Sequence, residues 1–365
     1  MREKNAVGLR RLHLVDSSRA DPSTGRRELM VSVFYPAQPA ATPAPLVRLV
    51  DHLFAPATDT TLATLAQKSA LSPADLEHIL SLTLPFAQPD SDLAVASDSA
   101  LRPVLIYYPG GLSHRLSNAP LCAQLAADGF IVVCLDAPRD APAVVYPDGR
   151  AVFGPPEPDE DYIWPRIADL HFLLDQLSVW NAAGPFAGQL DLSRIGAFGH
   201  SRGGYLALIA AVEDPRLRAV VNMDGFLWGR WSAAGTALDT FPDYFQAKAR
   251  AHRTPVLRLR GDQGDAARAR HGFEQESADL AGDFISLALH DWKHGDFATS
   301  PALCGAPEKL AATLHASPSP DRVKLLHTLL TGFFHDTLRT DTSPLVRFSP
   351  SLPGIDTHLR PALRT

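Results

Sequence analysis

The sequence predicts an α/β fold in which a mostly parallel central sheet is covered by helices on both faces. Short apolar runs alternate with amphipathic helical segments over much of the chain, which is typical of such a sheet. The composition is 45% hydrophobic and 20% charged, as in an ordinary globular protein with a sizeable core. Since a large α/β domain with insertions can reach 365 residues, we expect a single domain over residues 1–365.

The N-terminal part predicts a strand pair and a helical insertion. Residues 9–16 and 28–35 alternate apolar and polar side chains around a turn-rich segment, which indicates two antiparallel strands. Helical spacing follows between residues 59 and 85. It is interrupted at Ser72-Pro73, a favourable N-cap followed by proline at the first helical position. We interpret residues 51–95 as a helical insertion or lid.

The central part supplies the sheet and its helices. The expected elements, in chain order, are strand 102–110, helix 118–130, strand 131–138, helix 160–180, strand 194–200, helix 203–214 and strands 217–225, 254–262 and 284–291. A long aromatic-bearing segment, 226–253, interrupts this rhythm, and we interpret it as an inserted cap or pocket segment. A helix is expected near 320–338, followed by an irregular, proline-punctuated tail over 339–365.

Charge and cysteine usage exclude several classes of protein. The net charge is −6 and the chain has no basic cluster, so neither nucleic acid nor an anionic membrane surface is expected as a partner. Cys122, Cys134 and Cys304 are odd in number and lack C-x-x-C spacing, so neither a disulfide framework nor a zinc site is indicated. No segment reaches the ~18 apolar residues of a membrane span, and the N-terminus lacks an apolar signal core. We expect a cytoplasmic protein without metal or cofactor; its oligomeric state is not indicated.

The stretch IGAFGHSRGGYLAL, residues 195–208, carries the strongest chemical signal. It places Ser201 between Gly199 and Gly203, the two positions where a sharp strand-to-helix turn tolerates no bulky side chain. A glycine-rich loop with an incidental serine would also match the motif. However, an apolar strand precedes it and a helix follows, which is the context of a nucleophile elbow. Ser201 is therefore the candidate nucleophile.

Two backbone donors for an oxyanion are expected near this serine. The N–H of Arg202 opens the helix after Ser201, where the helix dipole favours negative charge. A second donor is expected in YYPGGLSHR (107–115), where Gly110 and Gly111 follow an apolar strand. The alternative is a plain turn after that strand. The residues leave open whether Gly111 or Leu112 donates its N–H.

The base and the acid each have more than one candidate. His290 and His294 both lie at the end of the last core strand, and a histidine there can equally be a solvated loop residue. For the acid, Asp224 follows the strand after the nucleophile, whereas Asp262 and Asp265 follow the next strand. Either loop can reach the same edge of the sheet. Spacing alone does not choose between them.

A resemblance to a known family distinguishes between these candidate bases and acids. The chain looks like the platelet-activating-factor acetylhydrolase family (isoform II type) of α/β-hydrolases, over roughly residues 8–300. The segments that carry the resemblance are RELMVSVFYPA (27–37), YYPGGLSHR (107–115), PRIADLHFLLDQL (165–177), GHSRGG (199–204), VVNMDG (220–225) and HGDFA (294–298). In this family the acid follows the strand after the nucleophile, which implies Asp224, and the histidine opens an H-x-x-F-type segment, which implies His294. Pro109 and the segment Asp136-Ala137-Pro138 depart from the pattern, since the family commonly has a histidine at each place.

The residues and the resemblance together predict a serine hydrolase acting on small-molecule carboxylic esters or thioesters. Phe226, Trp228 and Trp231 are expected to wall the substrate pocket. One alternative is an acyltransferase or cyclase that resolves the same acyl-enzyme with an alcohol or amine. Another is a non-catalytic binding protein on this fold, although its usual mark, a missing triad residue, is not found here.

Overall fold

The computed structural model describes most of the chain, in several stretches. They are residues 6–22, 24–38, 47–68, 72–84, 87–89, 101–154, 163–226, 230–231, 237–239, 248–263, 280–299, 316–317, 319–350 and 352–362.

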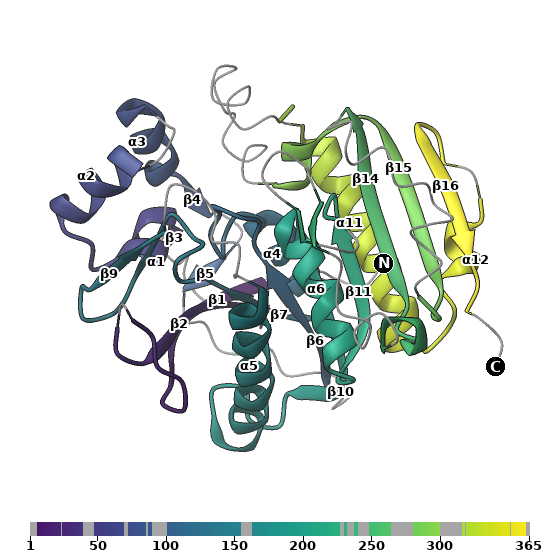
Figure 1. Cartoon of the computed structure of the whole chain (residues 1–365), viewed down its shortest axis with the longest axis horizontal. Coiled ribbons are helices and arrows are strands. Elements are labelled where there is room, and N and C mark those ends of the chain that lie inside the picture. Colours follow the sequence, from purple (N-terminus) through teal and green to yellow (C-terminus); the bar gives the residue numbers. More distant parts are fainter. Residues whose placement is uncertain are drawn as a thin grey trace.

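The centre of the molecule is a ten-stranded sheet, which runs across Figure 1. In spatial order its strands are β16 (Ile355–Arg360), β15 (Phe284–Lys293), β14 (Val256–Gln263), β11 (Leu217–Met223), β10 (Leu190–His200), β6 (Arg102–Tyr108), β7 (Ile131–Leu135), β2 (Arg27–Ala37), β1 (Ala6–Asp16) and β5 (Gln88–Pro89). The six strands from β15 to β7 are parallel to one another. Their carboxyl ends therefore share one edge, where ligands of open α/β sheets usually bind.

The first two strands form the expected antiparallel pair. β1 and β2 are paired over their whole length, from Ala6 opposite Ala37 to Asp16 opposite Arg27. β2 then pairs antiparallel with β7, with Val31 opposite Leu135. As a result, the turn between β1 and β2 lies at the same edge as the carboxyl end of β7.

Helices cover both faces of the sheet, as the alternating pattern predicts (Figure 1). On one face α5 (Ile163–Ala183) and α6 (Arg202–Glu213) pack on side chains such as Ile106 and Val220. On the other face α4 (Ala119–Ala127) and α11 (Pro320–Phe334) pack on alternate residues of the same strands, such as Leu105 and Val221. The α/β-hydrolase fold expected from the sequence is confirmed.

Short elements lie outside the main layers. The expected insertion, residues 51–95, contains α2 (Asp59–Lys68) and α3 (Pro73–Ser81), and α1 (Leu49–Phe54) begins two residues before it. β3 (Val47–Arg48) pairs with β4 (Thr83–Leu84) beside these helices. Two further two-stranded ladders join β8 (Ala143–Val145) to β9 (Ala151–Phe153) and β12 (Arg230–Trp231) to β13 (Ala237–Asp239). Most of segment 226–253, expected to be a cap, lies outside the described residues.

The C-terminal tail is more ordered than expected. The predicted helix is present as α11 and continues into the π-helical turn η2 (His335–Arg339). Residues 339–365 were expected to be irregular, but they contain α12 (Leu345–Phe348) and β16, the antiparallel edge strand of the main sheet. The period-2 pattern of IDTHLR accounts for the strand, because Ile355, Thr357 and Leu359 alternate with more exposed residues.

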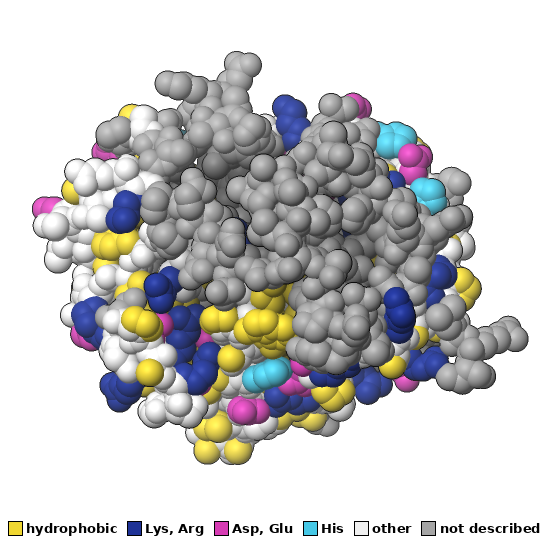
Figure 2. All heavy atoms as spheres, in the orientation of Figure 1, with side chains coloured by type: hydrophobic (Ala, Val, Ile, Leu, Met, Phe, Trp, Pro, Cys, Tyr) yellow, Lys and Arg dark blue, Asp and Glu magenta, His cyan; other side chains and the backbone are white. Residues whose placement is uncertain are grey.

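The described residues contain two buried thiols that are not joined in a disulfide. Cys122 on α4 and Cys134 on β7 are fully buried, and their sulfur atoms lie 3.6 Å apart. Within the described part of the chain, no helix is long and apolar enough to cross a membrane, and no cluster of His, Cys, Asp or Glu could hold a metal ion. Figure 2 shows Lys and Arg side chains interspersed with hydrophobic and acidic ones on the described part of one face.

Candidate active site

Ser201 occupies the turn between β10 and α6 in a strained backbone conformation. Its φ is 56° and its ψ is −123°, a combination that non-glycine residues rarely adopt. Its N–H donates to the carbonyl of Met223 at 2.8 Å, which ties the turn to the neighbouring strand β11. The strain is held by the surrounding sheet and exposes the hydroxyl at the carboxyl edge, as expected of a nucleophile elbow.

The two glycines that flank Ser201 are required by close backbone contacts. A Cβ on Gly203 would lie 2.1 Å from the carbonyl oxygen of Tyr108, and one on Gly199 would lie 2.4 Å from the carbonyl carbon of Gly203. Both distances are far below any normal carbon contact, and the obstacles are backbone atoms that cannot move aside. The glycines therefore let the start of α6 pass directly over the ends of β6 and β10.

Ser201, His294 and Asp224 form a continuous chain of hydrogen bonds. The Ser201 Oγ lies 2.9 Å from Nε2 of His294, and Nδ1 of His294 lies 2.5 Å from a carboxylate oxygen of Asp224. Because a carboxylate only accepts hydrogen bonds, Nδ1 carries the proton and Nε2 is left to accept from the serine hydroxyl. Asp224 is buried whereas about a third of the His294 side chain is exposed, so the imidazole remains accessible beside the serine.

Asp224 is held in place by the neighbouring strand β14 and by Asn222. Its φ is 53°, its N–H donates to Leu259 at 2.7 Å, and its second carboxylate oxygen accepts the N–H of Gly261 at 3.1 Å. The buried Asn222 fixes the turn, since its amide oxygen accepts from the Gly225 N–H at 2.8 Å. We did not single out Asn222 from the sequence, although an amide inside the apolar run VVNMDG was a usable signal.

His294 begins the short helix η1 (His294–Phe297), which is anchored by Asp296. The Asp296 carboxylate accepts the N–H of Lys293 at 2.7 Å and forms an ion pair with Arg322 on α11. On the other side, Nε2 of His200 donates to the carbonyl oxygen of His294 at 2.9 Å, and the two imidazole rings lie 4.5 Å apart between centroids. A histidine in a loop can rotate easily when nothing holds it. Here these contacts fix the backbone of His294 and pack against its imidazole ring.

His200 is a positioning residue that sequence reasoning missed. It is the residue directly before the nucleophile and is 91% buried, because only 9% of its surface is exposed. A carbonyl only accepts, so the Nε2 of His200 carries a proton, and the N–H fixes the backbone of the histidine that faces Ser201. The motif letters G-H-S-R-G contain this residue, but its partner lies 94 positions away, which no local pattern reveals.

The glycine-rich loop after β6 approaches the elbow closely. A Cβ on Gly110 would lie 3.5 Å from Cβ of Ser201, and one on Gly111 would lie 2.7 Å from the guanidinium carbon of Arg202. Leu112 has a φ of 55° and donates its N–H to the carbonyl oxygen of Asp140 at 3.0 Å. That bond occupies the Leu112 N–H, so of the two expected donors Gly111 is the better placed for an oxyanion.

The structure describes the side chains of only some of the other candidate residues. His290 pairs with the exposed Asp356 of the edge strand β16 at 3.1 Å. The side chains of Asp262, Trp228 and Trp231, and all of Asp265, lie outside what the structure describes. Phe226 is partly buried against the apolar layer under α5 and α6.

A second serine and histidine pair exists but has a different character. Ser32 Oγ lies 2.9 Å from Nε2 of His52 and also accepts a hydrogen bond from Nε of the buried Arg115 at 2.7 Å. Ser32 is fully buried in the middle of β2, where no substrate can reach it. Burial, together with the charges of Arg115 and Arg11, holds the pKa of His52 well below its usual value. The pair therefore joins the insertion to the sheet.

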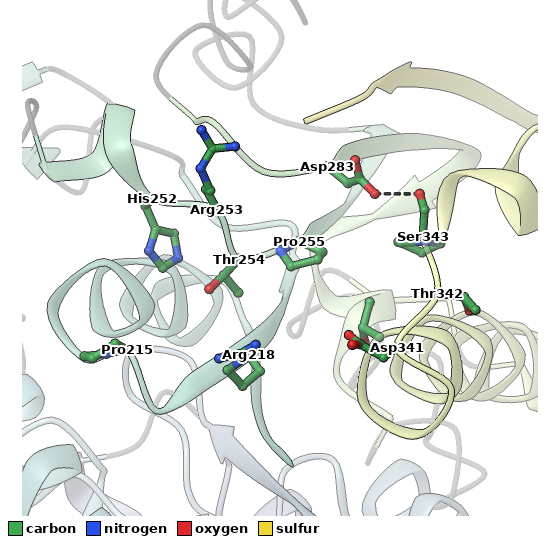
Figure 3. Close-up of a pocket in the computed structure, with 12 residues that line it drawn as sticks. Pro215, Arg218, His252, Arg253, Thr254, Pro255, Asp283, Asp341, Thr342 and Ser343 are labelled. Carbon is green, nitrogen blue, oxygen red and sulfur yellow. Dashed lines mark hydrogen bonds between the residues drawn. The ribbon is translucent and has the colours of Figure 1, made fainter. Parts of the chain in front are cut away.

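A cavity of about 510 Å³ lies at the opposite edge of the sheet (Figure 3). Arg218, His252 and Asp283 are among its lining residues, at the amino ends of the strands, and Asp283 accepts a hydrogen bond from Ser343 at 2.6 Å. Among the lining residues that the structure describes, no serine is paired with a histidine. The candidate active site is therefore the carboxyl edge that carries Ser201.

The sheet order and the helices on its two faces define the class of protein by its architecture: the chain has the α/β-hydrolase fold. No family model matches the chain. It is 32% identical over 133 residues to a probable 1-alkyl-2-acetylglycerophosphocholine esterase of Arthroderma benhamiae, a match that covers 35% of this chain and 32% of that protein. The chain thus spans about a third of the length of that curated relative.

A solved structure is similar over nearly the whole chain. It is a ferulic acid esterase from Streptomyces cinnamoneus, with a TM-score of 0.72 and 25% identity over 98% of this chain and 97% of that one. Both similar proteins are named as esterases, and the first agrees with the resemblance drawn from the sequence.

Proposed function

We propose that this chain is a serine esterase that hydrolyses small-molecule carboxylic esters through an acyl-enzyme. The observation that carries the proposal is the hydrogen-bonded chain from Ser201 through His294 to Asp224, set at a strained elbow on the carboxyl edge of the sheet. A buried acid, a partly exposed base and a hydroxyl in this order are the arrangement that activates a serine.

In the first step Ser201 Oγ attacks the ester carbonyl carbon while Nε2 of His294 takes the hydroxyl proton. Asp224, already bonded to Nδ1, stabilises the imidazolium that forms and keeps the ring in the productive tautomer. The imidazolium then gives its proton to the departing alkoxide, which leaves as an alcohol. In the second step water attacks the acyl-enzyme with His294 again as the base, and the acid is released.

The negative charge that develops on the carbonyl oxygen needs backbone donors. The N–H of Gly111, in the loop against the elbow, and the N–H of Arg202, at the start of α6, are the two candidates. The first residue of a helix has no intrahelical acceptor for its N–H, and the helix dipole adds positive potential at this end. Each donor of this kind contributes about 3 kcal/mol to transition-state stabilisation in comparable sites.

The named substrates of the two similar proteins support esters as the substrate class. One name specifies an acetyl ester of a glycerophospholipid and the other an ester of ferulic acid, so the two differ in acyl group and in leaving group. We therefore propose carboxylic esters as the chemical class of the substrate and leave the acyl group to experiment.

Covalent labelling tests the proposal. A fluorophosphonate probe should label the wild-type chain at Ser201, and Ser201→Ala should abolish both labelling and turnover of 4-nitrophenyl acetate. Ser32→Ala is the matched control, because Ser32 also contacts a histidine but is buried; this variant should still label at Ser201. Labelling that survives in Ser201→Ala would overturn the assignment. A burst of 4-nitrophenol that stalls until an alcohol or amine is added would replace hydrolysis by acyl transfer.

A further inference from the structure

A second cavity, of about 530 Å³, lies on the same edge of the sheet as Ser201. Its walls are the β1–β2 turn, the loop after β7 and the first turn of α5. The lining residues are Arg19, Ala20, Asp21, Pro22, Arg27, Pro138, Arg139, Asp140, Trp164, Pro165, Arg166 and Ala168.

This cavity is joined to the elbow through Asp140. One carboxylate oxygen of Asp140 pairs with the guanidinium of Arg202, the residue after the nucleophile. The other oxygen accepts from Nη1 of Arg166 at 2.6 Å, and the Asp140 carbonyl holds the N–H of Leu112 at 3.0 Å. One aspartate thus contacts the cavity wall, the elbow and the loop of the expected oxyanion donor.

The cavity carries more positive than negative charge. Arg27 is fully compensated, because it donates to Asp21 at 2.8 Å and to Asp169 at 2.6 and 2.9 Å. Arg19 is likewise bonded to Asp169, at 2.9 Å. In contrast, the exposed Arg139 forms no ion pair or hydrogen bond with any residue that the structure describes. An anion entering the cavity would meet this uncompensated guanidinium.

Arg166 supplies a second guanidinium, which is buried and has N–H donors without an acceptor among the described residues. Only 2% of its surface is exposed, and Nη1 is its one nitrogen with an acceptor; Nε and Nη2 have no hydrogen-bond partner among the described residues. Its guanidinium carbon lies 5.9 Å from the ring centroid of Tyr108, within the range of a cation–π contact. Buried charged donors are almost always satisfied, so an acceptor is expected here.

The remaining wall is apolar and lies at a helix start. Trp164, 45% exposed, lines the cavity in the first turn of the 21-residue helix α5. An exposed indole offers a flat apolar face, and the positive end of the helix dipole favours an anion nearby. The lining therefore combines guanidinium donors for a planar or tetrahedral oxyanion with an aromatic surface for the group attached to it.

We propose that this cavity is a binding subsite for an anionic group, a carboxylate or a phosphate carried on an apolar or aromatic body. Arg139 and Arg166 bind the anion and Trp164 contacts the apolar part. This proposal rests on the proposed function and specifies the substrate class more closely. The substrates would be esters that carry a negative charge away from the scissile carbonyl. The charged group would bind in the cavity, and the scissile carbonyl would reach Ser201 past Asp140.

Binding is tested first, without turnover. Calorimetry on Ser201→Ala with phenyl phosphate, benzoate and the neutral benzamide should show binding of at least one anion and none of the amide. Arg139→Gln, introduced into the same background, should weaken that binding about tenfold, the effect of losing one charge-assisted hydrogen bond. Arg166→Lys, which keeps the charge but not the planar fork, should also weaken it. Arg218→Gln is the matched control, an exposed arginine lining the cavity at the opposite edge, and should have no effect.

Kinetics then assign the anion to one end of the substrate. Two charged esters are compared, each with its neutral methyl ester: 4-acetoxybenzoate, charged on the leaving group, and mono-4-nitrophenyl glutarate, charged on the acyl group. In each pair, the kcat/KM ratio of charged to neutral ester is measured. One ratio should exceed unity and fall about tenfold in Arg139→Gln. The inference is overturned if no anion binds, if Arg139→Gln and Arg218→Gln have equal effects, or if both ratios stay at unity. Anion binding by a wild-type chain that hydrolyses no ester would support the anion site and overturn only the proposed function.

Discussion

Replacing Asp224 by asparagine is the sharpest test of the proposed triad. The change preserves size and shape. The remaining amide oxygen can still accept the Gly261 N–H, now at 3.1 Å, so the turn should keep its structure. The amide nitrogen would then face Nδ1 of His294, at a position where the carboxylate oxygen now lies 2.5 Å away. Because an amide nitrogen only donates, Nδ1 would have to become the acceptor.

The substitution would therefore reverse the tautomer of the His294 imidazole. With Nδ1 unprotonated, the neutral ring carries its proton on Nε2, which then points a donor at Ser201 and cannot take the hydroxyl proton. Wrong-tautomer variants of such triads lose about 10⁴ in kcat, or about 5 kcal/mol of transition-state stabilisation. We expect the same loss here, with the circular dichroism spectrum and the thermal midpoint close to wild type.

The assay is hydrolysis of 4-nitrophenyl acetate, with kcat and KM determined separately. Asp262→Asn is the matched control, because Asp262 ends the next strand and was the competing acid; it should lower kcat about tenfold or less. If Asp262→Asn were the crippled variant and Asp224→Asn were nearly normal, the acid would follow the later strand. The 2.5 Å contact between Asp224 and His294 would then have no catalytic role.

Three further predictions concern positioning and stability. His200→Leu should lower kcat about tenfold because the donor to the His294 carbonyl is lost, whereas His200→Gln, which keeps an N–H, should recover most of it; equal losses and unchanged pH profiles in both would remove the positioning role. Gly203→Ala should lower the free energy of unfolding by about 3 kcal/mol, because its Cβ would lie 2.1 Å from a backbone oxygen, whereas Gly188→Ala, with open space but a φ of 67°, should cost about 1 kcal/mol in denaturant titrations. Burial lowers the pKa of His114 from 6.5 to about 4, so between these values the unfolded chain binds the extra proton. The free energy of unfolding should therefore fall with decreasing pH by up to about 1.4 kcal/mol per unit, a slope that His114→Asn should reduce.

The local patterns predicted most of the elements because they depend on neighbours in sequence. The alternating side chains of β1 and β2 and the glycines around Ser201 each report a constraint that acts within a few residues. The irregular tail was the error, since the strand β16 depends on its pairing with β15 as well as on its own period-2 pattern. Its short period-2 pattern is flanked by prolines at 353 and 361, and pairing partners are not visible in such a stretch.

The residues of the candidate site were harder to predict from the sequence, because two neighbouring strands end at the same edge of the sheet and carry similar residues there. Asp224 follows β11 and Asp262 lies near the carboxyl end of β14, two parallel strands whose spacing places both residues within range of a histidine. The contact to His294 depends on the left-handed backbone at Asp224 and on Asn222 beneath it, neither of which follows from spacing. Likewise, Asp140 joins Arg166 and Arg202 from positions 26 and 62 residues away, an ion-pair network that only the folded chain reveals.

The two buried thiols can report local unfolding of the chain without an added label. Burial and the neighbouring sulfur of Cys134 raise the pKa of Cys122 well above its usual value, so the reactive thiolate is rare in the folded state. A water-soluble alkylating reagent can reach either sulfur only when α4 separates from β7. With Cys304 replaced by serine, the rate of alkylation would measure how often α4 detaches from the sheet, without any added label.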